Sequence, residues 1–299
     1  MSKPSLPIHR FREDHMATYF EIQIAHENEK YARQAAQAAF QTTARMENLL
    51  SRYRENSEVS QLRRLLPGET LRLNQETFSC LQLAAEMHQL TRGAFDPALG
   101  AQMDVLRRGE TETVAAREPT TRGRLVMDPK TFTVRCEDAP VNLDLGAIGK
   151  GFALDRMADD LRDWEIGRAL LIAGRSSILA LNGPDPLSDA GWEVFLSGPR
   201  RLLLGRGSLS TSGTSVKGAH ILDPRTATPA QGPYRTWATA KSAAVSDALS
   251  TAWMLLPPDE IREVCATYGE AGAIIQQTEH AREIFIPGPL DGSLPLQYA

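Results

Sequence analysis

Residues 141–155 read VNLDLGAIGKGFALD, a stretch in which a strand pattern changes into a helix pattern. Three glycines lie between the apolar, β-prone start and the helical end, with Lys150 just before the last of them. Glycine lets the backbone approach a ligand closely, and the N–H groups at the start of a helix can face an anion. Together with Asp144 and Lys150, this backbone suits a phosphate or a phosphate–metal pair. A strand–helix corner whose glycines only relieve crowding explains the same residues equally well.

The two common nucleotide-binding motifs do not fit this stretch. A P-loop needs four residues between its first glycine and a Gly-Lys pair, followed by Ser or Thr. Here two residues separate Gly146 from Gly149, and Gly151 follows Lys150. The dinucleotide-binding order G-x-G-x-x-G does not fit either, so neither motif explains the corner.

Length and composition describe an ordinary globular protein. The chain has 299 residues, of which 42% are hydrophobic and 23% charged, as is usual for a soluble domain. No shift in composition marks a linker, so we expect one domain over residues 1–299, with residues 1–15 as a flexible lead-in. The net charge of −4 provides no general basic field, and we expect no nucleic-acid or membrane partner.

Cysteine usage and the N-terminal composition predict a cytoplasmic protein. Cys80, Cys136 and Cys265 show neither metal-site spacing nor an even disulfide set. Five of the six histidines, His9, His15, His26, His88 and His280, lie in unrelated contexts, which argues against a zinc site. The first twenty residues contain no apolar segment of a secretion signal, and no apolar run approaches the roughly 20 residues that span a bilayer.

Hydrophobic periodicity predicts an irregular alternation of strands and helices. Helices are expected over residues 28–50, 58–62, 75–90, 151–164 and 246–256. Strands are expected over residues 18–25, 125–128, 131–136, 141–145, 169–172, 178–181, 192–196, 202–212, 238–240, 270–276 and 281–286. Residues 101–125 lack apolar periodicity and are expected to form an irregular excursion. The hairpin-like strand runs favour an α+β fold with mixed or antiparallel sheets and flanking helices over a doubly wound parallel sheet.

Asp247 and Thr251 form a candidate metal site. They are four residues apart on a predicted helix and therefore lie on one face. A carboxylate and a hydroxyl offer oxygen ligands to a hard cation such as magnesium, and the adjacent Ser250 can contribute through water. In the alternative interpretation, which the residues alone favour, Asp247 interacts with the helix dipole and Thr251 is simply packed.

Other polar and aromatic residues have two interpretations each. Asp96 precedes a proline and suits a helix N-cap, while Phe95 beside it can stack on a planar ring or simply fill space. His220 and Asp223 lie in a turn-rich loop, where the histidine is either a proton acceptor or a solvated side chain. Tyr53 can stack on a ring or cover the preceding helix.

The order of these motifs along the chain resembles the ApbE-like family of FAD:protein FMN transferases. The matching segments are MATYF (16–20), LLSRYRENSEVSQL (49–62), TRGAFDPALG (91–100), LDLGAIGKGFALD (143–155), SLSTSGT (208–214), HILDPRTATP (220–229) and SDALSTA (246–252). Together they span nearly the whole chain in the family's order.

The resemblance implies magnesium-dependent transfer of FMN from FAD to a serine or threonine hydroxyl of a target protein, with release of AMP. It also implies an α+β fold in which FAD occupies a cleft between two lobes. By matching motif positions, the FAD site would be lined by Met16, Tyr53, Ala94, Phe95, Asp96, Asp144, Lys150, Ile221 and Leu222. The metal would be held by the Ala147 carbonyl, Asp247 and Thr251, with Ser250 at a position that is acidic in some relatives. His220 stands where the family has a histidine close to the reacting pyrophosphate, and this histidine or a carboxylate would accept the proton of the acceptor hydroxyl.

The chain departs from the family pattern at three places. The usual Gly-Gly-Asp is replaced by residues 173–176 (AGRS), the usual Thr-Gly by Thr226-Ala227, and Met-Gly-Thr by residues 16–18 (MAT). We expect these departures to affect the acceptor side and the fine position of FAD more than the binding of the metal. Most relatives are exported lipoproteins, and without an export signal we expect a cytoplasmic acceptor.

Two other functions share these motifs. One is a magnesium-dependent FAD pyrophosphatase, in which water replaces the protein hydroxyl and the products are FMN and AMP. The other is a flavin-binding protein without catalytic activity, which only stores or presents FAD. The intact Asp247 and Thr251 argue against the second alternative. The loss of the family's acidic residue, with a cation at Arg175, is compatible with it.

Overall fold

An eight-stranded antiparallel sheet is the framework of the protein. The computed structural model describes residues 6–107, 123–187, 191–196, 201–213, 221–226, 228–278 and 283–287. The strands of the large sheet are β1 (Ile8–His15), β2 (Thr18–Ala25), β6 (Ala169–Ala173), β7 (Ser177–Ala180), β10 (Gly207–Gly213), β13 (Arg235–Ala240), β14 (Gly272–Gln276) and β15 (Glu283–Ile286). They follow the order β1-β2-β6-β7-β10-β13-β14-β15, and every neighbouring pair is antiparallel.

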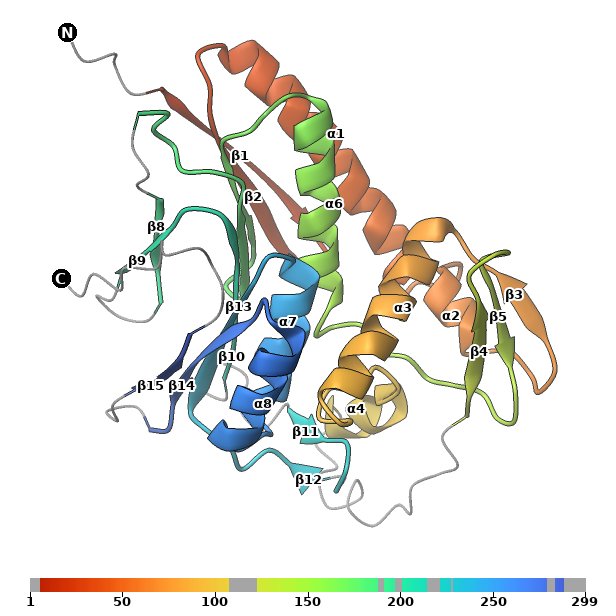
Figure 1. The fold of residues 1–299 in the computed structure, drawn as a ribbon. Helices are drawn as coiled ribbons and strands as arrows, with labels where there is room; N and C mark the ends of the chain where they lie inside the picture. Colours follow the sequence, from red (N-terminus) through yellow and green to blue (C-terminus); the bar gives the residue numbers. More distant parts are fainter. Residues whose placement is uncertain are drawn as a thin grey trace, which may run out of the picture.

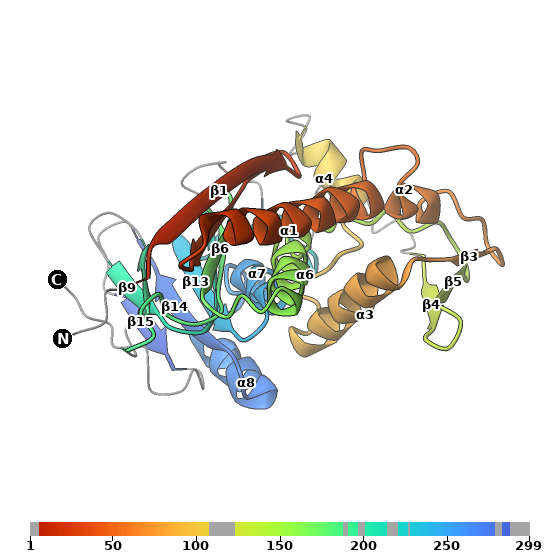
Figure 2. The ribbon, with the colours of Figure 1, turned by 90° about the horizontal axis from the view of Figure 1, so that it is seen from above.

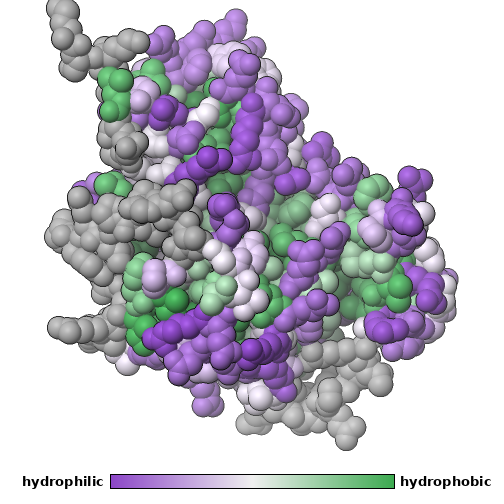
Figure 3. All heavy atoms as spheres, viewed as in Figure 1, coloured by the Kyte–Doolittle hydropathy of each residue, from purple (hydrophilic) through white to green (hydrophobic). Residues whose placement is uncertain are grey.

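Helices cover one face of this sheet. The helices are α1 (Glu29–Leu50), α2 (Glu58–Leu62), α3 (Gln75–Leu90), α4 (Gly100–Arg107), α6 (Gly149–Asp163), α7 (Ala243–Ala252) and α8 (Pro258–Tyr268). Figure 1 and Figure 2 show α1, α6 and α7 on the same side of the large sheet. Ala32, Ala35 and Ala39 are buried on α1, and their small side chains let the helix pack close to its neighbours. The outer surfaces of α1 and α8 are mostly hydrophilic in the view of Figure 3.

Smaller sheets complete the fold. They consist of β3 (Thr70–Arg72), β5 (Thr133–Cys136) and β4 (Leu125–Asp128), of β8 (Trp192–Phe195) and β9 (Arg201–Leu204), and of β11 (Leu222–Asp223) and β12 (Thr228–Pro229). The first lies beside α2 and α3, away from the large sheet (Figure 1). The β8–β9 hairpin packs Trp192 and Val194 against the sheet face opposite the helices, where Leu170 and Trp237 are also buried. The predicted α+β class with antiparallel sheets is confirmed.

Residues 8–15 were wrongly assigned to a flexible lead-in. They form β1, which pairs with β2 over its whole length. β1 ends the sheet, and charged side chains such as Arg10, Arg12 and Glu13 are exposed along it. Charged residues protect an edge strand from pairing with other chains, and they also erase the apolar alternation by which a strand is recognised. Residues 1–5 lie outside the described ranges.

Residues 141–145 do not form the predicted strand. Val141, Leu143 and Leu145 are buried as expected, but the segment is irregular. Its backbone bonds instead to residues 97–100, because Gly100 N–H donates to Asn142 O at 2.9 Å and Asp144 N–H donates to Pro97 O at 2.7 Å. Alternating burial therefore arises here without a strand of the sheet.

Two helices were missed, and a third was predicted with both of its bounds too late in the sequence. α4 occupies the first part of the expected excursion, and residues 108–122 of that excursion lie outside the described ranges. α7 begins at Ala243 instead of residue 246, because the Ser242 side chain accepts the Val245 N–H and caps it. α7 ends at Ala252, before the predicted end at residue 256 and before the prolines expected to end it, and Pro258 is instead the first residue of α8. In the described part of the chain, no helix is long and apolar enough to cross a membrane.

Candidate active site between the glycine corner and α7

The turn at residues 144–151, called here the glycine corner, lies directly against α7. A Cβ on Gly151 would lie 2.1 Å from the Ala243 carbonyl oxygen, so only glycine permits this contact between α6 and α7. Gly149 is different, since a Cβ there would meet only Leu145 at an ordinary 3.9 Å. The third glycine of the motif therefore serves helix packing, and that packing brings the corner to the residues of α7.

Asp247 is the centre of the arrangement. Its side chain is 4% exposed, and Oδ2 accepts hydrogen bonds from Lys150 Nζ at 3.4 Å and from Gly151 N–H at 3.2 Å. Oδ1 accepts a hydrogen bond from Ser177 Oγ, on β7, at 3.0 Å. The structure thus joins Asp247 and Lys150, both predicted site residues, although they lie far apart in the sequence. α7 begins before the predicted start, so Asp247 lies in its second turn, where the helix dipole is no explanation for a carboxylate.

The Lys150 side chain bridges the corner and α7. Besides Asp247, Lys150 Nζ donates to the Gly146 carbonyl at 3.0 Å. Gly151 N–H points to Asp247, and among the described residues no N–H donates to the Ala147 carbonyl. Carboxylate, carbonyl and hydroxyl oxygens are the ligands of hard cations, so the donor set fits magnesium. Within the described ranges, no group of three or more His, Cys, Asp and Glu forms a metal site by itself.

A row of hydroxyl groups extends the site along α7. Ser212, at the end of β10, places its Oγ 3.0 Å from Ser250 Oγ and 3.2 Å from Thr251 Oγ1. Ser250 is completely buried and its Oγ donates to the Asp247 carbonyl at 2.9 Å, so its hydroxyl is engaged within the helix. The sequence did not single out Ser212 as a site residue, although the run Ser-Thr-Ser-Gly at the end of a predicted strand was a signal for it.

Asp144 belongs to a different network on the other side of the corner. Its Oδ1 accepts the Gly146 N–H at 2.8 Å, and its Oδ2 lies 2.7 Å from Arg52 Nη1. Arg52 also reaches Asp104, in α4, at 2.8 Å, and its own side chain is only 7% exposed. Sequence reasoning missed Arg52, which stands among other charged residues after α1 and whose partners are remote in the sequence.

The segment with the predicted residues Ala94, Phe95 and Asp96 is mostly buried. Ala94 and Phe95 are core residues at 1% and 3% exposure, so this structure leaves the Phe95 ring no room to stack on a ligand. Asp96 Oδ1 accepts the Ala98 N–H at 2.8 Å and lies 3.9 Å from His88 Nδ1. The predicted N-cap role of Asp96 is wrong, since α4 begins only at Gly100.

The remaining predicted ligand-binding residues lie on three separate segments. Tyr53 is 69% exposed, with the Arg52 guanidinium 5.6 Å from its ring centroid. Met16 forms the tight turn between β1 and β2 and has a positive φ of 51°. Ile221 and Leu222 are buried, and His220 lies outside the described residues.

Glu47 fixes the Met16 turn from α1. It accepts the Met16 N–H, and its Oε1 lies 2.9 Å from Arg54 Nη2. Burial alone would raise the pKa of Glu47, but the bonds from Arg54 and Met16, with the charges of Arg54 and His15, outweigh burial and lower it.

Asp155 fixes the start of α7 from α6. Its carboxylate accepts hydrogen bonds from Ser242 Oγ and from the N–H groups of Ala243 and Ala244, at 2.6 to 3.0 Å. Burial raises the pKa of this carboxyl group, and the three hydrogen bonds oppose the shift. Asp155 lies one helical turn beyond Gly151, so the same helix that carries the corner also caps α7.

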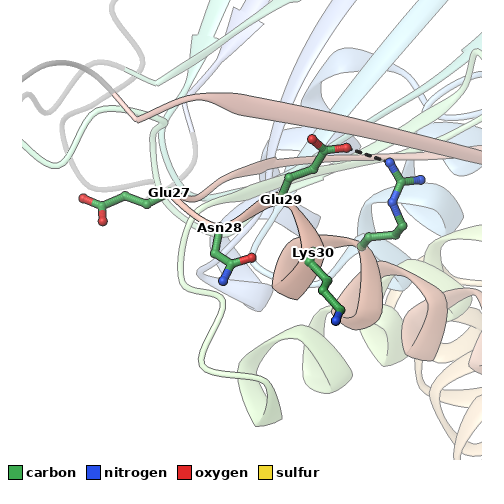
Figure 4. A pocket seen from close by; sticks show the side chains of 5 residues that line it. Glu27, Asn28, Glu29 and Lys30 are labelled. Carbon is green, nitrogen blue, oxygen red and sulfur yellow. Dashed lines mark hydrogen bonds and ion pairs between the residues drawn. The ribbon is translucent and has the colours of Figure 1, made fainter.

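A separate depression lies at the start of α1 (Figure 4). It is lined by Glu27, Asn28, Glu29, Lys30 and Arg33. Asn28 caps α1, and Arg33 pairs with Glu29 at 2.7 Å, so these residues have local roles at the helix end. None of the predicted site residues lines this depression.

Both the sequence and the fold are matched by known proteins. The sequence pattern of the ApbE family matches residues 16–275. The chain belongs to the ApbE family. The resemblance inferred from the seven segments is thereby confirmed.

Two proteins named FAD:protein FMN transferase illustrate the similarity in sequence. The one from Klebsiella pneumoniae (strain 342) is 28% identical over 214 residues, which are 65% of this chain and 66% of that protein. The one from Rhodobacter capsulatus is 29% identical over 229 residues, which are 68% of this chain and 42% of that protein. This chain thus matches less than two thirds of the length of either relative.

Solved structures of ApbE proteins share the fold. The ApbE protein from Thermotoga maritima superposes with a TM-score of 0.77 at 24% identity, covering 94% of this chain and 97% of that one. Flavin transferase ApbE from Vibrio cholerae gives a TM-score of 0.78 at 19% identity, covering 94% and 98%. The arrangement of the sheet and its helices is therefore that of ApbE proteins.

Proposed function

We propose that this protein transfers FMN from FAD to a serine or threonine hydroxyl of a target protein, with release of AMP and dependence on magnesium. The observation that carries the proposal is the contact of Lys150 with Asp247, which joins the glycine corner to α7. Membership of the ApbE family and the names of the curated relatives support the choice of FAD as the substrate.

The reaction needs charge neutralisation more than covalent help. The acceptor oxygen forms a bond to the phosphorus of the FMN half, and the bond from that phosphorus to the oxygen of AMP breaks. Lys150 would neutralise charge on the pyrophosphate. Asp247, Thr251 and the Ala147 carbonyl would hold magnesium, which supplies further positive charge when bound. Ser177 would keep the Asp247 carboxylate in one orientation through its hydrogen bond to Oδ1.

The flavin nucleotide would lie along the segments that flank the corner. Asp144, Asp96, Tyr53 and the Met16 turn offer polar groups and one exposed ring for binding, and Ile221–Leu222 would add apolar surface. Among these, the exposed Tyr53 has the ring surface for stacking that Phe95 lacks. His220 stays the proposed acceptor of the hydroxyl proton.

Incubation with FAD, magnesium and candidate acceptor peptides tests the proposal. The expected result is a peptide that gains the mass of one FMN, with one AMP released for each modified peptide. Free FMN and AMP without a modified peptide would instead establish an FAD pyrophosphatase. Bound FAD without either product would establish a binding protein and overturn the proposed reaction.

The acceptor is proposed to be a cytoplasmic protein. Cys80, Cys136 and Cys265 are buried free thiols, which is compatible with a reducing compartment. Mass spectrometry of cytoplasmic proteins from cells with and without this enzyme would identify the acceptor by its added FMN.

A further inference from the structure

Arg52 joins three segments that are distant in the sequence. It lies just after α1, and its nearly buried guanidinium makes close contacts with two carboxylates and a carbonyl. Nη1 lies 2.7 Å from Asp144 Oδ2, while Nη2 lies 2.8 Å from Asp104 Oδ2 and donates to the Gly100 carbonyl at 2.8 Å. One side chain thereby connects the end of α1, the start of α4 and the glycine corner.

The same three segments carry proposed FAD residues. Tyr53 follows Arg52 directly, Asp96 lies four residues before Gly100, and Asp144 is itself a partner of the guanidinium. The spacing of these three groups therefore depends on the contacts of one arginine.

The contacts also determine how Asp144 is oriented. Arg52 holds Oδ2, and the Gly146 N–H holds Oδ1 at 2.8 Å, so both oxygens of the carboxylate have a fixed donor. The planar guanidinium donates to the carboxylate oxygen, and such charge-assisted hydrogen bonds have a defined geometry. Lysine cannot reproduce this arrangement, because its single ammonium lacks the planar fork that reaches two carboxylates at once.

We propose that Arg52 is a positioning residue of the FAD site, which orients Asp144 toward the nucleotide. This inference rests on the proposed function, because it takes Asp144 as an FAD-binding residue. Without the guanidinium, Asp144 and Asp104 lose their common cation, and Asp144 Oδ2 loses its contact with Arg52.

The test is a double-mutant cycle read by FAD binding, measured as quenching of flavin fluorescence. Arg52→Gln and Asp144→Asn are compared singly and combined, with Arg33→Gln as the matched control on the exposed face of α1. We expect Arg52→Gln to weaken FAD binding by about tenfold or more, which corresponds to a lost hydrogen bond to a charged group. The double variant should bind no more than about twofold more weakly than Asp144→Asn alone, because Arg52 acts through Asp144.

Turnover and a conservative variant separate positioning from a general structural role. In Arg52→Gln, the KM for FAD should rise while kcat at saturating FAD stays within about threefold of the wild type. Arg52→Lys should weaken FAD binding less than Arg52→Gln but still measurably. If Arg52→Gln does not fold in a thermal melt, Arg52→Lys decides, and wild-type FAD binding in that variant would overturn the proposal.

The outcomes distinguish this inference from the proposed function. If Asp144→Asn weakens FAD binding and Arg52→Gln does not, the positioning role is wrong and the proposed function stands. Independent, additive losses in the two variants would also overturn the positioning role. If Asp144→Asn binds FAD like the wild type, the assignment of Asp144 to the FAD site fails, and the role of Arg52 fails with it.

Discussion

Asp247 has a proposed role in holding magnesium, and it also contacts Lys150, Gly151 and Ser177. Asp247→Asn removes the negative charge, so we expect the rate of AMP release to fall by about 100-fold or more. The amide keeps one acceptor for Gly151 or Ser177, so the loss of stability should stay near 1–3 kcal/mol and the protein should remain folded. AMP release measured by chromatography, together with a thermal melt, checks both statements. Asp159→Asn, on the exposed face of α6, is the control, and near-normal AMP release by Asp247→Asn would contradict the role.

Glu47 gives a pH-dependent prediction. Its pKa in the folded protein is lowered below 4.5, so the carboxylate adds stability above that pH and loses it as the pH falls through the lower folded value. Glu47→Gln should therefore lower the free energy of unfolding by up to about 1 kcal/mol at neutral pH. The difference in unfolding free energy between the variant and the wild type should disappear below pH 4.5. Urea unfolding at several pH values measures this difference, and Glu55→Gln at an exposed position is the control. A difference in unfolding free energy that stays constant into the acid range would show that the charge of Glu47 does not contribute to stability.

Among single residues, the sequence predicted some members of the candidate site and missed others. Asp247 and Lys150 were found because they stand in motifs, and the structure brings them into contact. Arg52 and Ser212 were missed because their roles depend on partners from distant segments, which spacing along the chain does not reveal. Phe95 shows the opposite case, since a motif position does not tell whether the ring points to a ligand or to the core.

At the scale of elements, the glycine corner offers a matched pair of substitutions in one helix. Gly151→Ala places a Cβ 2.1 Å from the Ala243 carbonyl, so α6 and α7 must move apart at a cost of about 2–3 kcal/mol. Gly149→Ala meets Leu145 only at 3.9 Å and should leave stability unchanged or raise it by up to about 1 kcal/mol. Denaturant unfolding compares the two, and FAD turnover should fall only in Gly151→Ala. Equal stability of both variants would show that the α6–α7 contact adjusts freely.

Elements were predicted well where a long amphipathic pattern exists. α1 and α3 match the expected ranges almost to the residue, and asparagine caps mark the start of both. β1 was hidden by its charges, and residues 141–145 imitate a strand because an irregular segment buries every second side chain. α8 was missed because a proline can start a helix as well as end one.

At the scale of the whole molecule, the fold class followed from the irregular order of strands and helices. The strand order did not, because β2 pairs with β6 across more than a hundred residues and β10 lies between β7 and β13. Such pairings depend on which faces are buried together. The family resemblance supplied what local patterns lacked, namely the expectation that the glycine corner and the helix at Asp247 lie together, and the structure places them in contact.

The joining of two distant segments in one site predicts that magnesium and FAD bind cooperatively. The corner carries Lys150 and the Ala147 carbonyl, while α7 carries Asp247 and Thr251. With these residues in their proposed roles, either ligand would order part of the site for the other. Calorimetric titration should show that magnesium tightens FAD binding, by a factor of about 5–150, and that FAD tightens magnesium binding by the same factor. In Asp247→Asn the factor should fall toward one, whereas Asp159→Asn should keep it. The equality of the two factors is a thermodynamic requirement, so unequal values would show that a titration was incomplete. FAD binding that stays unchanged when a chelator removes magnesium would overturn the shared site.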